Sequence, residues 1–409
     1  MSMNVYVARQ PIFDQHKRVF GYELLYRTAG QNVYQETDGD LATTRVAANS
    51  LLSIGMQTLV GNGRAFINFT EKLLLENLPS FFPPDMIVVE ILEQVPPTPE
   101  IIHACQELRK EGYILALDDF VFSSGMEPLV DLANIIKVDI IQTPLDEVED
   151  ICRSLRGRGI RLLAEKIETY QEFDQAVRLG FSYFQGYFFR RPEVLRRREV
   201  ASTKINLFNL LIEVNKPDFS MRRIEKLVGS DASLSYKLLR YINSAYYSLV
   251  SEVTSIRHAL VYLGEKGVRQ FVSLVATSFM SGDKPEELLR VSVVRARLCE
   301  LLAERGRVTG DKSNYFLLGL FSLLDAMLDT EMASIMEQLP VIADIKEALV
   351  YRRGPMRPLL EAVIAQEQGD WDRSRELLAD IGVDPEELMH LYIKSIAWAD
   401  LFTTGCQEE

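Results

Sequence analysis

The sequence of 409 residues is poor in the side chains that most often build soft-metal and redox sites. It contains 4 histidines and 4 cysteines, and the cysteines, Cys105, Cys152, Cys299 and Cys406, lie far apart without a Cys-x-x-Cys pair. Zinc sites and disulfide frameworks need thiols or imidazoles at close and regular spacing. The cysteine pattern therefore indicates reduced structural thiols, as expected in a cytosolic protein.

Long apolar runs are also missing. The N-terminus reaches Arg9 and Asp14 without a long apolar region, and no later stretch approaches about 18 uninterrupted apolar residues. We therefore expect a cytoplasmic protein without a membrane span. The net charge of -13 argues against broad nucleic-acid binding, although an acidic protein can still hold a local basic pocket for a phosphate ligand.

The composition is that of a folded protein with two domains. Hydrophobic residues make up 47% and charged residues 25% of the chain, and 409 residues are too many for one ordinary core. A basic run at 190–199 is interrupted by Glu193 and Glu199, which favours a solvated linker helix over a phosphate or nucleic-acid contact. We predict domains at 1–195 and 205–409, with the linker at 196–204.

Apolar alternation in the first domain predicts a barrel. Strands at 5–8 and 19–26 are too close for a crossover helix between them and therefore form an antiparallel hairpin. Further strands are expected at 64–69, 86–91, 113–118, 135–139, 161–165 and 181–186, with helices at 41–54, 71–78, 99–110, 145–155 and 170–179. About eight strands with intervening helices favour a TIM-like (β/α)8 barrel with one antiparallel strand.

Polar residues recur where these strands end. The apolar run from Ile114 ends in Asp118 and Asp119, which repel one another unless a cation, a hydrogen-bond network or solvent lies between them. An isolated Asp pair is more often a turn or a helix cap. Here, however, other strands end in the same way, with Glu23, Asn68, Glu90, Lys137, Asp139, Glu165 and Gln185.

In a barrel these strand ends converge on one face, where sites of this fold are built. Oxygen ligands without a histidine or cysteine cluster point to a hard cation, Mg²⁺ or Mn²⁺. Two such ions could activate a water molecule and stabilise a leaving oxygen, and a lysine among them suits an anionic substrate.

Six motifs occur in order along this domain: Gly21–Arg27 (GYELLYR), Val89–Glu93 (VEILE), Leu117–Phe120 (LDDF), Ile136–Asp139 (IKVD), Ala164–Glu168 (AEKIE) and Phe184–Tyr187 (FQGY). As an ordered set they resemble the motifs of EAL-domain cyclic di-GMP phosphodiesterases, over about residues 1–195. The resemblance implies a two-metal site for Mg²⁺ or Mn²⁺ and cyclic di-GMP as the ligand.

The resemblance also implies roles for individual residues. Metal ligands, direct or through water, would be Glu23, Asn68, Glu90, Asp118 and Glu165, with Asp119 and Asp139 completing the acidic site. Lys137, Glu165 and Asp119 would be catalytic, with Lys137 positioning the attacking water. Arg27 would hold a ligand phosphate, with Gln185 and Leu25 also at the substrate, and Glu93 and Glu168 would anchor the ligands from behind.

Three departures from the family pattern bear on activity. The signature reads Glu23-Leu24-Leu25 instead of Glu-Ala-Leu, which adds bulk beside a ligand. Residues 121–126 read VFSSGM where the family carries a Gly-Thr-Gly-Tyr-Ser-Ser loop. Lys166 replaces a family glycine and adds a cation near the proposed metals.

The second half of the chain shows only helical spacing. Apolar periodicity predicts helices at 205–214, 221–228, 234–242, 256–263, 268–279 and 388–401. Asp231 and Ser255 are expected caps, Gly264 a stop, and Asp384-Pro385 a helix start. His258 and His390 are the histidines of this half, and neither is followed by Asp, so both are read as core or surface residues.

This half resembles an HDOD domain through the segments at 231–245, 255–260 and 319–325. HDOD domains look like HD phosphohydrolases that have lost their metals, which implies a non-catalytic output or regulatory role. Together the halves resemble an EAL-HDOD signalling protein, and the HDOD half would bind a protein partner. A homodimer is also compatible with the resemblance.

Two functions follow, with a weaker third. The first is a metal-dependent phosphodiesterase that hydrolyses cyclic di-GMP to linear pGpG, with weak or conditional activity. The second is a catalytically inactive receptor or scaffold that acts through nucleotide or protein binding, which the altered loop at 121–126 favours. The third is a barrel enzyme acting on another phosphorylated metabolite.

Overall fold

The computed structural model describes residues 5–28, 56–118, 125–143, 145–193, 202–216, 218–229, 232–243, 252–282 and 284–403. The chain divides into two compact units. The first comprises residues 1–189 with the short segment Gln366–Trp371, and the second comprises residues 190–365 and 372–409. The predicted helix at 41–54, the Asp231 cap and residues 119–124 lie outside the described residues.

The first unit is a closed barrel of eight strands in sequential order. The strands are β1 (Val5–Asp14), β2 (Val19–Thr28), β3 (Arg64–Phe69), β4 (Ile87–Ile91), β5 (Ile114–Leu117), β6 (Ile135–Asp139), β7 (Arg161–Ile167) and β8 (Tyr183–Gly186). β1 runs antiparallel to both β2 and β8, and the other neighbouring pairs are parallel. The predicted hairpin and barrel with one antiparallel strand are confirmed.

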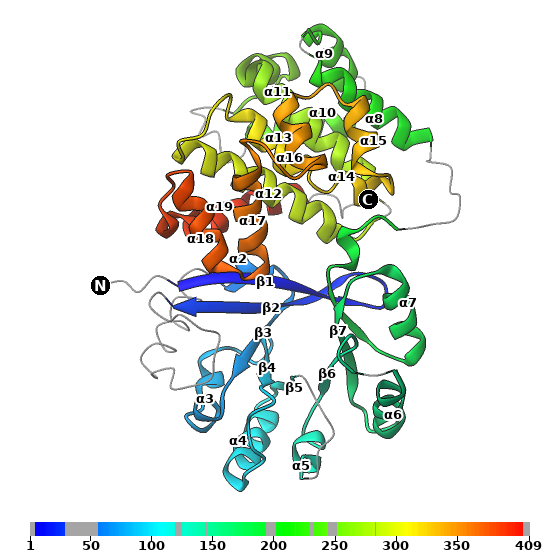
Figure 1. Ribbon diagram of the computed structural model, residues 1–409, viewed down its shortest axis with the longest axis vertical. Helices are drawn as coiled ribbons and strands as arrows, with labels where there is room; N and C mark the ends of the chain where they lie inside the picture. Colours follow the sequence, from blue (N-terminus) through cyan, green and yellow to red (C-terminus); the bar gives the residue numbers. More distant parts are fainter. Residues whose placement is uncertain are drawn as a thin grey trace. The chain divides into compact units, whose positions relative to one another are not determined.

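Helices follow most of the parallel strands and lie around the outside of the sheet (Figure 1). They are α2 (Met56–Val60), α3 (Glu71–Leu75), α4 (Pro99–Lys110), α5 (Glu127–Val130), α6 (Leu145–Leu155) and α7 (Tyr170–Leu179), with short 3-10 turns at Leu78–Phe81 and Phe188–Arg190. The bounds of α4, α6 and α7 agree with the sequence prediction. The predicted helix at 71–78 is shorter, because the chain leaves it at Glu76 and Asn77 takes a left-handed conformation.

One apolar layer fills the barrel. It takes one residue from each of β1 and β3 to β8, namely Ile12, Phe66, Val88, Ala116, Ile135, Leu163 and Tyr183. Side chains in a strand alternate between faces with a period of two, so the residue two positions further along points into the barrel as well. In the parallel strands that residue lies nearer the carboxyl end, which is where the sequence changes from apolar to polar.

Two local features after β7 set the start of α7 and the close approach of β8 to β7. Thr169 caps α7 in a reciprocal capping box: its Oγ1 accepts from the Glu172 N–H at 3.2 Å, and the Glu172 carboxylate accepts from the Thr169 N–H at 3.1 Å. Gly186 pairs with Ile167 at φ +151°, and a Cβ on Gly186 would lie 2.0 Å from the Ile167 carbonyl oxygen. Only glycine allows this close approach of β8 to β7.

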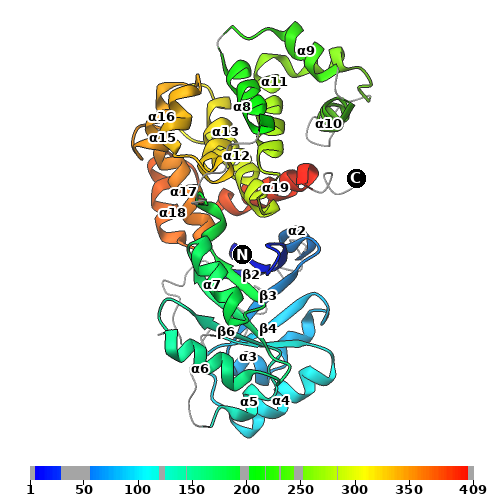
Figure 2. The same ribbon diagram turned by 90° about the vertical axis from the view of Figure 1, so that its right-hand side faces the viewer.

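The described part of the second unit contains helices and no strand (Figure 2). The helices are α8 (Ser202–Asn215), α9 (Met221–Gly229), α10 (Ala232–Ile242), α11 (Ile256–Met280), α12 (Glu286–Arg305), α13 (Ser313–Phe321), α14 (Leu324–Leu328), α15 (Met332–Gln338), α16 (Ala343–Val350), α17 (Arg357–Gln368), α18 (Trp371–Asp380) and α19 (Pro385–Thr403). α12 is buried along most of its length and packs against α13 and α19. The prediction of an all-helical second half is confirmed.

Two helix starts and one helix interruption in this unit lie where the sequence predicted them. Ser255 Oγ accepts from the His258 N–H at 3.1 Å at the start of α11, and Asp384 accepts from the Glu386 N–H at 2.9 Å at the start of α19. Gly264, at φ +62° and ψ -177°, interrupts α11 between the two predicted helices.

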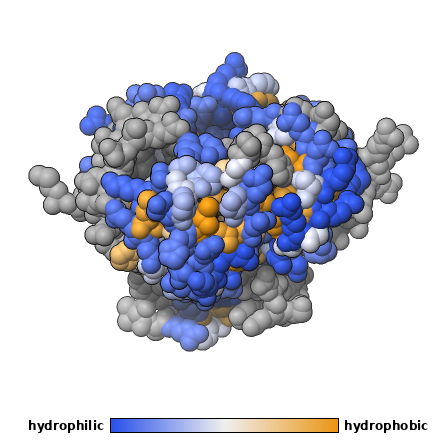
Figure 3. All heavy atoms as spheres, turned by 90° about the horizontal axis from the view of Figure 1, so that it is seen from below, coloured by the Kyte–Doolittle hydropathy of each residue, from blue (hydrophilic) through white to orange (hydrophobic). Residues whose placement is uncertain are grey.

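The surface seen from below the view of Figure 1 is mostly hydrophilic, with small apolar areas near its centre (Figure 3). No helix in the described ranges is long and apolar enough to cross a membrane.

Candidate functional site: an acidic cluster around a buried lysine

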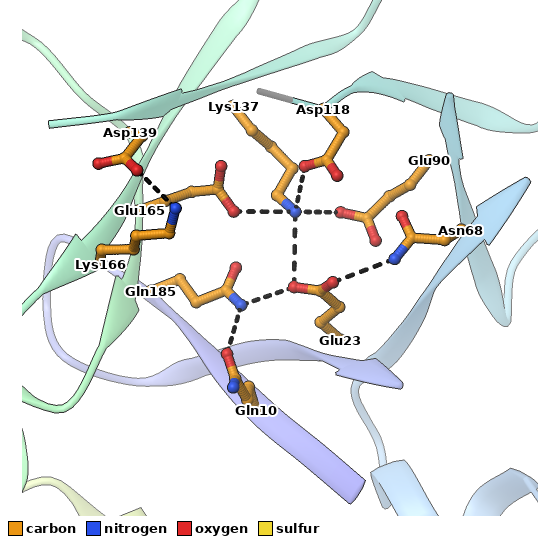
Figure 4. Close-up of polar contacts among 10 residues, drawn as sticks. All are labelled: Gln10, Glu23, Asn68, Glu90, Asp118, Lys137, Asp139, Glu165, Lys166 and Gln185. Carbon is orange, nitrogen blue, oxygen red and sulfur yellow. Dashed lines mark hydrogen bonds and ion pairs between the residues drawn. The ribbon is translucent and has the colours of Figure 1, made fainter. Parts of the chain in front are cut away.

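A polar layer lies directly beyond the apolar layer at the carboxyl ends of the parallel strands. Each member follows its apolar neighbour by two residues, as Asn68 follows Phe66 and Glu90 follows Val88. The same step yields Asp118, Lys137, Glu165 and Gln185. Glu23 joins them from β2, two residues after Gly21, whose Cβ would lie 2.5 Å from the Arg64 carbonyl oxygen. The strand period therefore explains why residues far apart in the sequence meet (Figure 4).

Lys137 occupies the centre of this layer. Its side chain is 1% exposed, and its Nζ lies 2.7 Å from Asp118 Oδ1 and 2.8 Å from Glu90 Oε1. The same Nζ lies 3.0 Å from Glu165 Oε1 and 3.5 Å from Glu23 Oε2. Four carboxylates thus converge on one ammonium group (Figure 4), and negative charge is in excess in a buried place.

The pKa values of the clustered acids are shifted in different directions by their surroundings. Burial raises the pKa of Glu165 to about 8 and that of Glu90 well above its ordinary value, since Lys137 offsets only part of the desolvation and neighbouring carboxylates oppose ionisation. Burial alone would also raise the pKa of Glu23, but the Lys137 ammonium and hydrogen bonds from Gln185 and Asn68 lower it. The four surrounding carboxylates raise the pKa of Lys137, although its burial acts in the opposite sense.

Several buried oxygens of the cluster have no hydrogen-bond partner among the described residues: Asn68 Oδ1, Glu90 Oε2, Glu165 Oε2 and Gln185 Oε1. Buried polar atoms in proteins are normally satisfied, so these oxygens point to a group that accepts their lone pairs. Carboxylate and amide oxygens are the ligands that Mg²⁺ and Mn²⁺ prefer. The residues therefore fit a hard cation, although within the described ranges no three acidic, His or Cys side chains form a ready-made metal shell. The acids gather around Lys137 instead.

Gln10 belongs to the site and was missed by the sequence reasoning. Its Oε1 accepts from Gln185 Nε2 at 3.0 Å, and Gln185 Nε2 also donates to Glu23 Oε2 at 2.6 Å. Because β1 runs in the opposite direction, the residue that reaches this layer comes two positions before Ile12. The predicted antiparallel hairpin already implied this position, because in a strand of opposite direction the residue of the polar layer precedes its apolar neighbour.

Asp139 and Lys166 form a separate pair at one side of the cluster (Figure 4). Lys166 Nζ lies 2.5 Å from Asp139 Oδ2, and Asp139 Oδ1 accepts from the N–H groups of Ile141 and Gln142 at 2.9 and 3.0 Å. Burial acts to raise the pKa of Asp139, but these three hydrogen bonds outweigh it and lower the pKa. These contacts favour the ionised form of Asp139, and both of its oxygens already accept hydrogen bonds.

The remaining predicted site residues lie further out. Leu25 packs with Tyr6, Ala8 and Trp371, all within the first unit, and Arg27 lies on β2 opposite Tyr6. Glu93 and Glu168 are exposed, just after β4 and β7. Asp119 lies outside the described residues. The anchoring role of the two glutamates and the ligand contacts of Leu25 and Arg27 stay predictions.

The fold and the site together define a class of protein: a (β/α)8 barrel with an oxygen-rich acidic site at the carboxyl ends of its strands, joined to an all-helical domain. The family model of the EAL domain matches residues 52–192, and that of the HDOD domain matches residues 204–338. Each half therefore carries a match of its own.

Two relatives cover nearly the whole chain. Cyclic di-GMP phosphodiesterase CdgJ of Vibrio cholerae is 41% identical over 397 residues, which are 96% of this chain and 92% of CdgJ. The uncharacterized protein YuxH of Bacillus subtilis is 37% identical over 404 residues, 97% of this chain and 98% of YuxH. This chain belongs to the family of proteins that join an EAL domain to an HDOD domain.

Among solved structures, the Bacillus subtilis YkuI protein, with an EAL domain and in complex with cyclic di-GMP and calcium, covers 63% of this chain and 73% of its own. Its sequence identity is 21% and its TM-score 0.37. Since the TM-score is below 0.5, the family assignment rests on the sequence matches and not on this superposition.

Proposed function

We propose that the barrel binds cyclic di-GMP and hydrolyses it to linear pGpG with a divalent cation, and that the HDOD domain is a non-catalytic output or regulatory domain. The observation that carries the proposal is the buried acidic cluster around Lys137, with oxygens left over for a hard cation. The similarity to a cyclic di-GMP phosphodiesterase over 96% of the chain supports the choice of substrate.

The metal ligands would be Glu23, Asn68, Glu90, Asp118 and Glu165, with the predicted Asp119 and Asp139 beside them. Mg²⁺ or Mn²⁺ bound there would supply an activated water and charge stabilisation at the leaving oxygen. A mechanism of this kind explains why the chain concentrates so much buried negative charge in one place. Without a cation to bind, that charge would only destabilise the barrel.

The chain's own residues would place and move protons. Lys137 keeps its charge, and its ammonium would donate hydrogen bonds to the attacking water and to a phosphate oxygen once the carboxylates that now surround it turn to the cation. Glu165, whose pKa burial raises to about 8 in the metal-free barrel, would give up its proton when the cation binds and would then act as an ionised ligand beside the attacking water. Gln185 holds Glu23 in place through its amide, and Arg27 would bind the second phosphate.

The test is a turnover assay on the purified full-length protein with Mg²⁺ or Mn²⁺, with products separated by chromatography and identified by mass. We expect linear pGpG from the wild type and a loss of at least about 100-fold for Glu23→Gln, because the change removes a charged ligand without changing shape. Glu107→Gln, on an exposed residue of α4, is the matched control and should retain full turnover. Folded, metal-loaded protein that leaves cyclic di-GMP intact would refute the proposal.

A catalytically inactive receptor is the second candidate. Residues 121–126 read VFSSGM, and the resemblance associates the family loop at this place with metal retention. A receptor would bind cyclic di-GMP in a calorimetric titration with and without Mn²⁺ and release no pGpG over hours. Measurable turnover that is lost in Glu23→Gln would exclude it. The cytoplasmic location, the protein partner of the HDOD domain and the homodimer stay predictions.

A further inference from the structure

Asp139 differs from the other acids of the site in what it contacts. Its two oxygens accept three hydrogen bonds, from Lys166 Nζ and from the N–H groups of Ile141 and Gln142. The acids around Lys137, in contrast, keep buried oxygens without a hydrogen-bond partner in the described part of the chain, such as Glu90 Oε2 and Glu165 Oε2. The site therefore has two parts. Around Lys137, carboxylate oxygens lack a hydrogen-bond partner among the described residues, whereas at Asp139 both carboxylate oxygens already accept hydrogen bonds.

Lys166, which makes this contact, also has an unusual backbone conformation. Its φ is +58°, in the left-handed region that side chains other than glycine rarely adopt, and it lies where the register between β7 and β8 shifts, between Ala164 and Ile167. A non-glycine residue held in this region stores strain, and such outliers often mark functional positions. The strained residue makes the ion pair with Asp139.

The position beside Asp139 is suited to a second cation. Asp139 and Glu165 are direct neighbours across β6 and β7, at the carboxyl ends of both strands. Glu165 Oε1 contacts Lys137, while its Oε2 is buried and free to serve a second group. Two carboxylates on adjacent strands, one of them shared with the Lys137 cluster, resemble the bridging arrangement of two-metal sites.

We infer that Lys166 is a built-in cation that takes the place of a second divalent ion at Asp139, so that this chain binds one divalent ion in the Lys137 cluster. The inference rests on the proposed function, because it concerns the metal site of that proposal. The ammonium is tethered to the strand next to Asp139, so a divalent ion would have to displace it and work against its charge. The Ile141 and Gln142 N–H groups further limit how Asp139 can turn toward an ion.

The experiment is a count of bound Mn²⁺ on the full-length protein, by calorimetric titration and by the loss of the free Mn²⁺ signal in electron paramagnetic resonance. We expect about one Mn²⁺ per wild-type chain and about two for Lys166→Ala. The Lys166 side chain is 49% exposed, so its truncation leaves no buried cavity. Lys166→Arg, which keeps the charge, should retain about one.

Two further variants give the inference its controls. Lys110→Ala removes the same charge from an exposed ion pair with Glu107 on α4 and should leave the count at about one. Asp139→Asn combined with Lys166→Ala should return the count from about two to about one, because the second ion would lose its ligand. A gain in Lys110→Ala would mean that net charge alone controls the count, and it would overturn the inference.

The remaining outcomes separate this inference from the proposed function. A count of about two in the wild type, or no gain in Lys166→Ala, overturns the inference and leaves cyclic di-GMP hydrolysis intact. A gain in Lys166→Ala together with no pGpG from any variant supports the inference and refutes the phosphodiesterase. If no variant binds Mn²⁺, both are refuted.

Discussion

Buried charges are arranged differently in the barrel and in the helical domain. In the helical domain three buried cations each lie close to a carboxylate: Lys284 Nζ lies 2.7 Å from Asp329, Arg290 Nη2 lies 2.6 Å from Asp400, and Arg297 Nη1 lies 2.5 Å from Glu300. In the barrel, Glu23, Glu90, Asp118 and Glu165 share the single ammonium of Lys137.

The difference separates buried charges that are paired within the fold from an acidic cluster that has more carboxyl groups than cations. A buried ion pair costs desolvation but gains the attraction of its partner, whereas carboxyl groups in excess of their cation must take up a proton or a counter-ion to be neutralised. The helical domain therefore needs no ion to explain its buried charges. The barrel cluster has more carboxyl groups than cations, and this is the physical basis of the metal site that we propose.

The largest expected effect comes from removing the shared ammonium. Lys137→Met leaves four carboxylates without a cation and should lower the free energy of unfolding of the metal-free barrel by about 3–5 kcal/mol. Calorimetric melting with and without Mn²⁺ measures it, and the ion should restore much of the loss by binding the native state. Lys284→Met in the helical domain is the matched variant and should be destabilised without any rescue by Mn²⁺. Equal behaviour of the two variants would break the comparison.

The next effect is a pH dependence of the barrel's stability to which Glu165 contributes. Burial raises the pKa of Glu165 to about 8, so between its ordinary value of 4.5 and about 8 the folded protein holds a proton that the unfolded chain releases. Rising pH therefore favours unfolding in this window, by up to about 1.4 kcal/mol per pH unit, and the stabilisation is fully present only below it.

Denaturant unfolding of metal-free protein at pH 6, 7 and 8 measures this slope. Glu165→Gln cannot ionise and should reduce the slope by the share of one group while keeping the shape of the side chain, and the raised pKa values of Glu90, Glu300 and Asp325 account for the slope that remains. A slope that persists unchanged in Glu165→Gln would assign the titration to another group. Saturating Mn²⁺ should also flatten the slope in the wild type, because the ion replaces the proton.

The smallest expected effect is a change in stability that should have opposite signs in the barrel and in the helical domain. Glu90→Gln removes one of the excess carboxylates and should stabilise the metal-free barrel by about 1–2 kcal/mol, while weakening Mn²⁺ binding at least about tenfold. Asp329→Asn in the helical domain removes the carboxylate that lies 2.7 Å from the Lys284 ammonium and should destabilise the protein instead. Melting curves and Mn²⁺ titrations check both variants, and a destabilised Glu90→Gln would contradict the view that the charge is in excess.

Much of the barrel could be predicted because the apolar pattern of a strand lies within a few consecutive residues of the sequence. The alternation in residues 64–69 and 135–139 and the short hairpin loop after Asp14 are local signals, and they led to the correct number and order of strands. α2 and α5 have 5 and 4 residues, too few for a helical period to show in the sequence, and both were missed. The site acids were found because each follows an apolar strand.

The sequence by itself determined that acidic and amide side chains gather where the barrel strands end, since the period of two and the parallel strand direction leave them nowhere else to point. Only the tertiary structure decided how these side chains pair. Lys137 reaches four acids and Lys166 reaches Asp139 because the closed barrel sets distances between strands that are far apart in the chain. A long flexible side chain has no preferred partner until that geometry exists, and Gln10 joins the site only because β1 runs against β8.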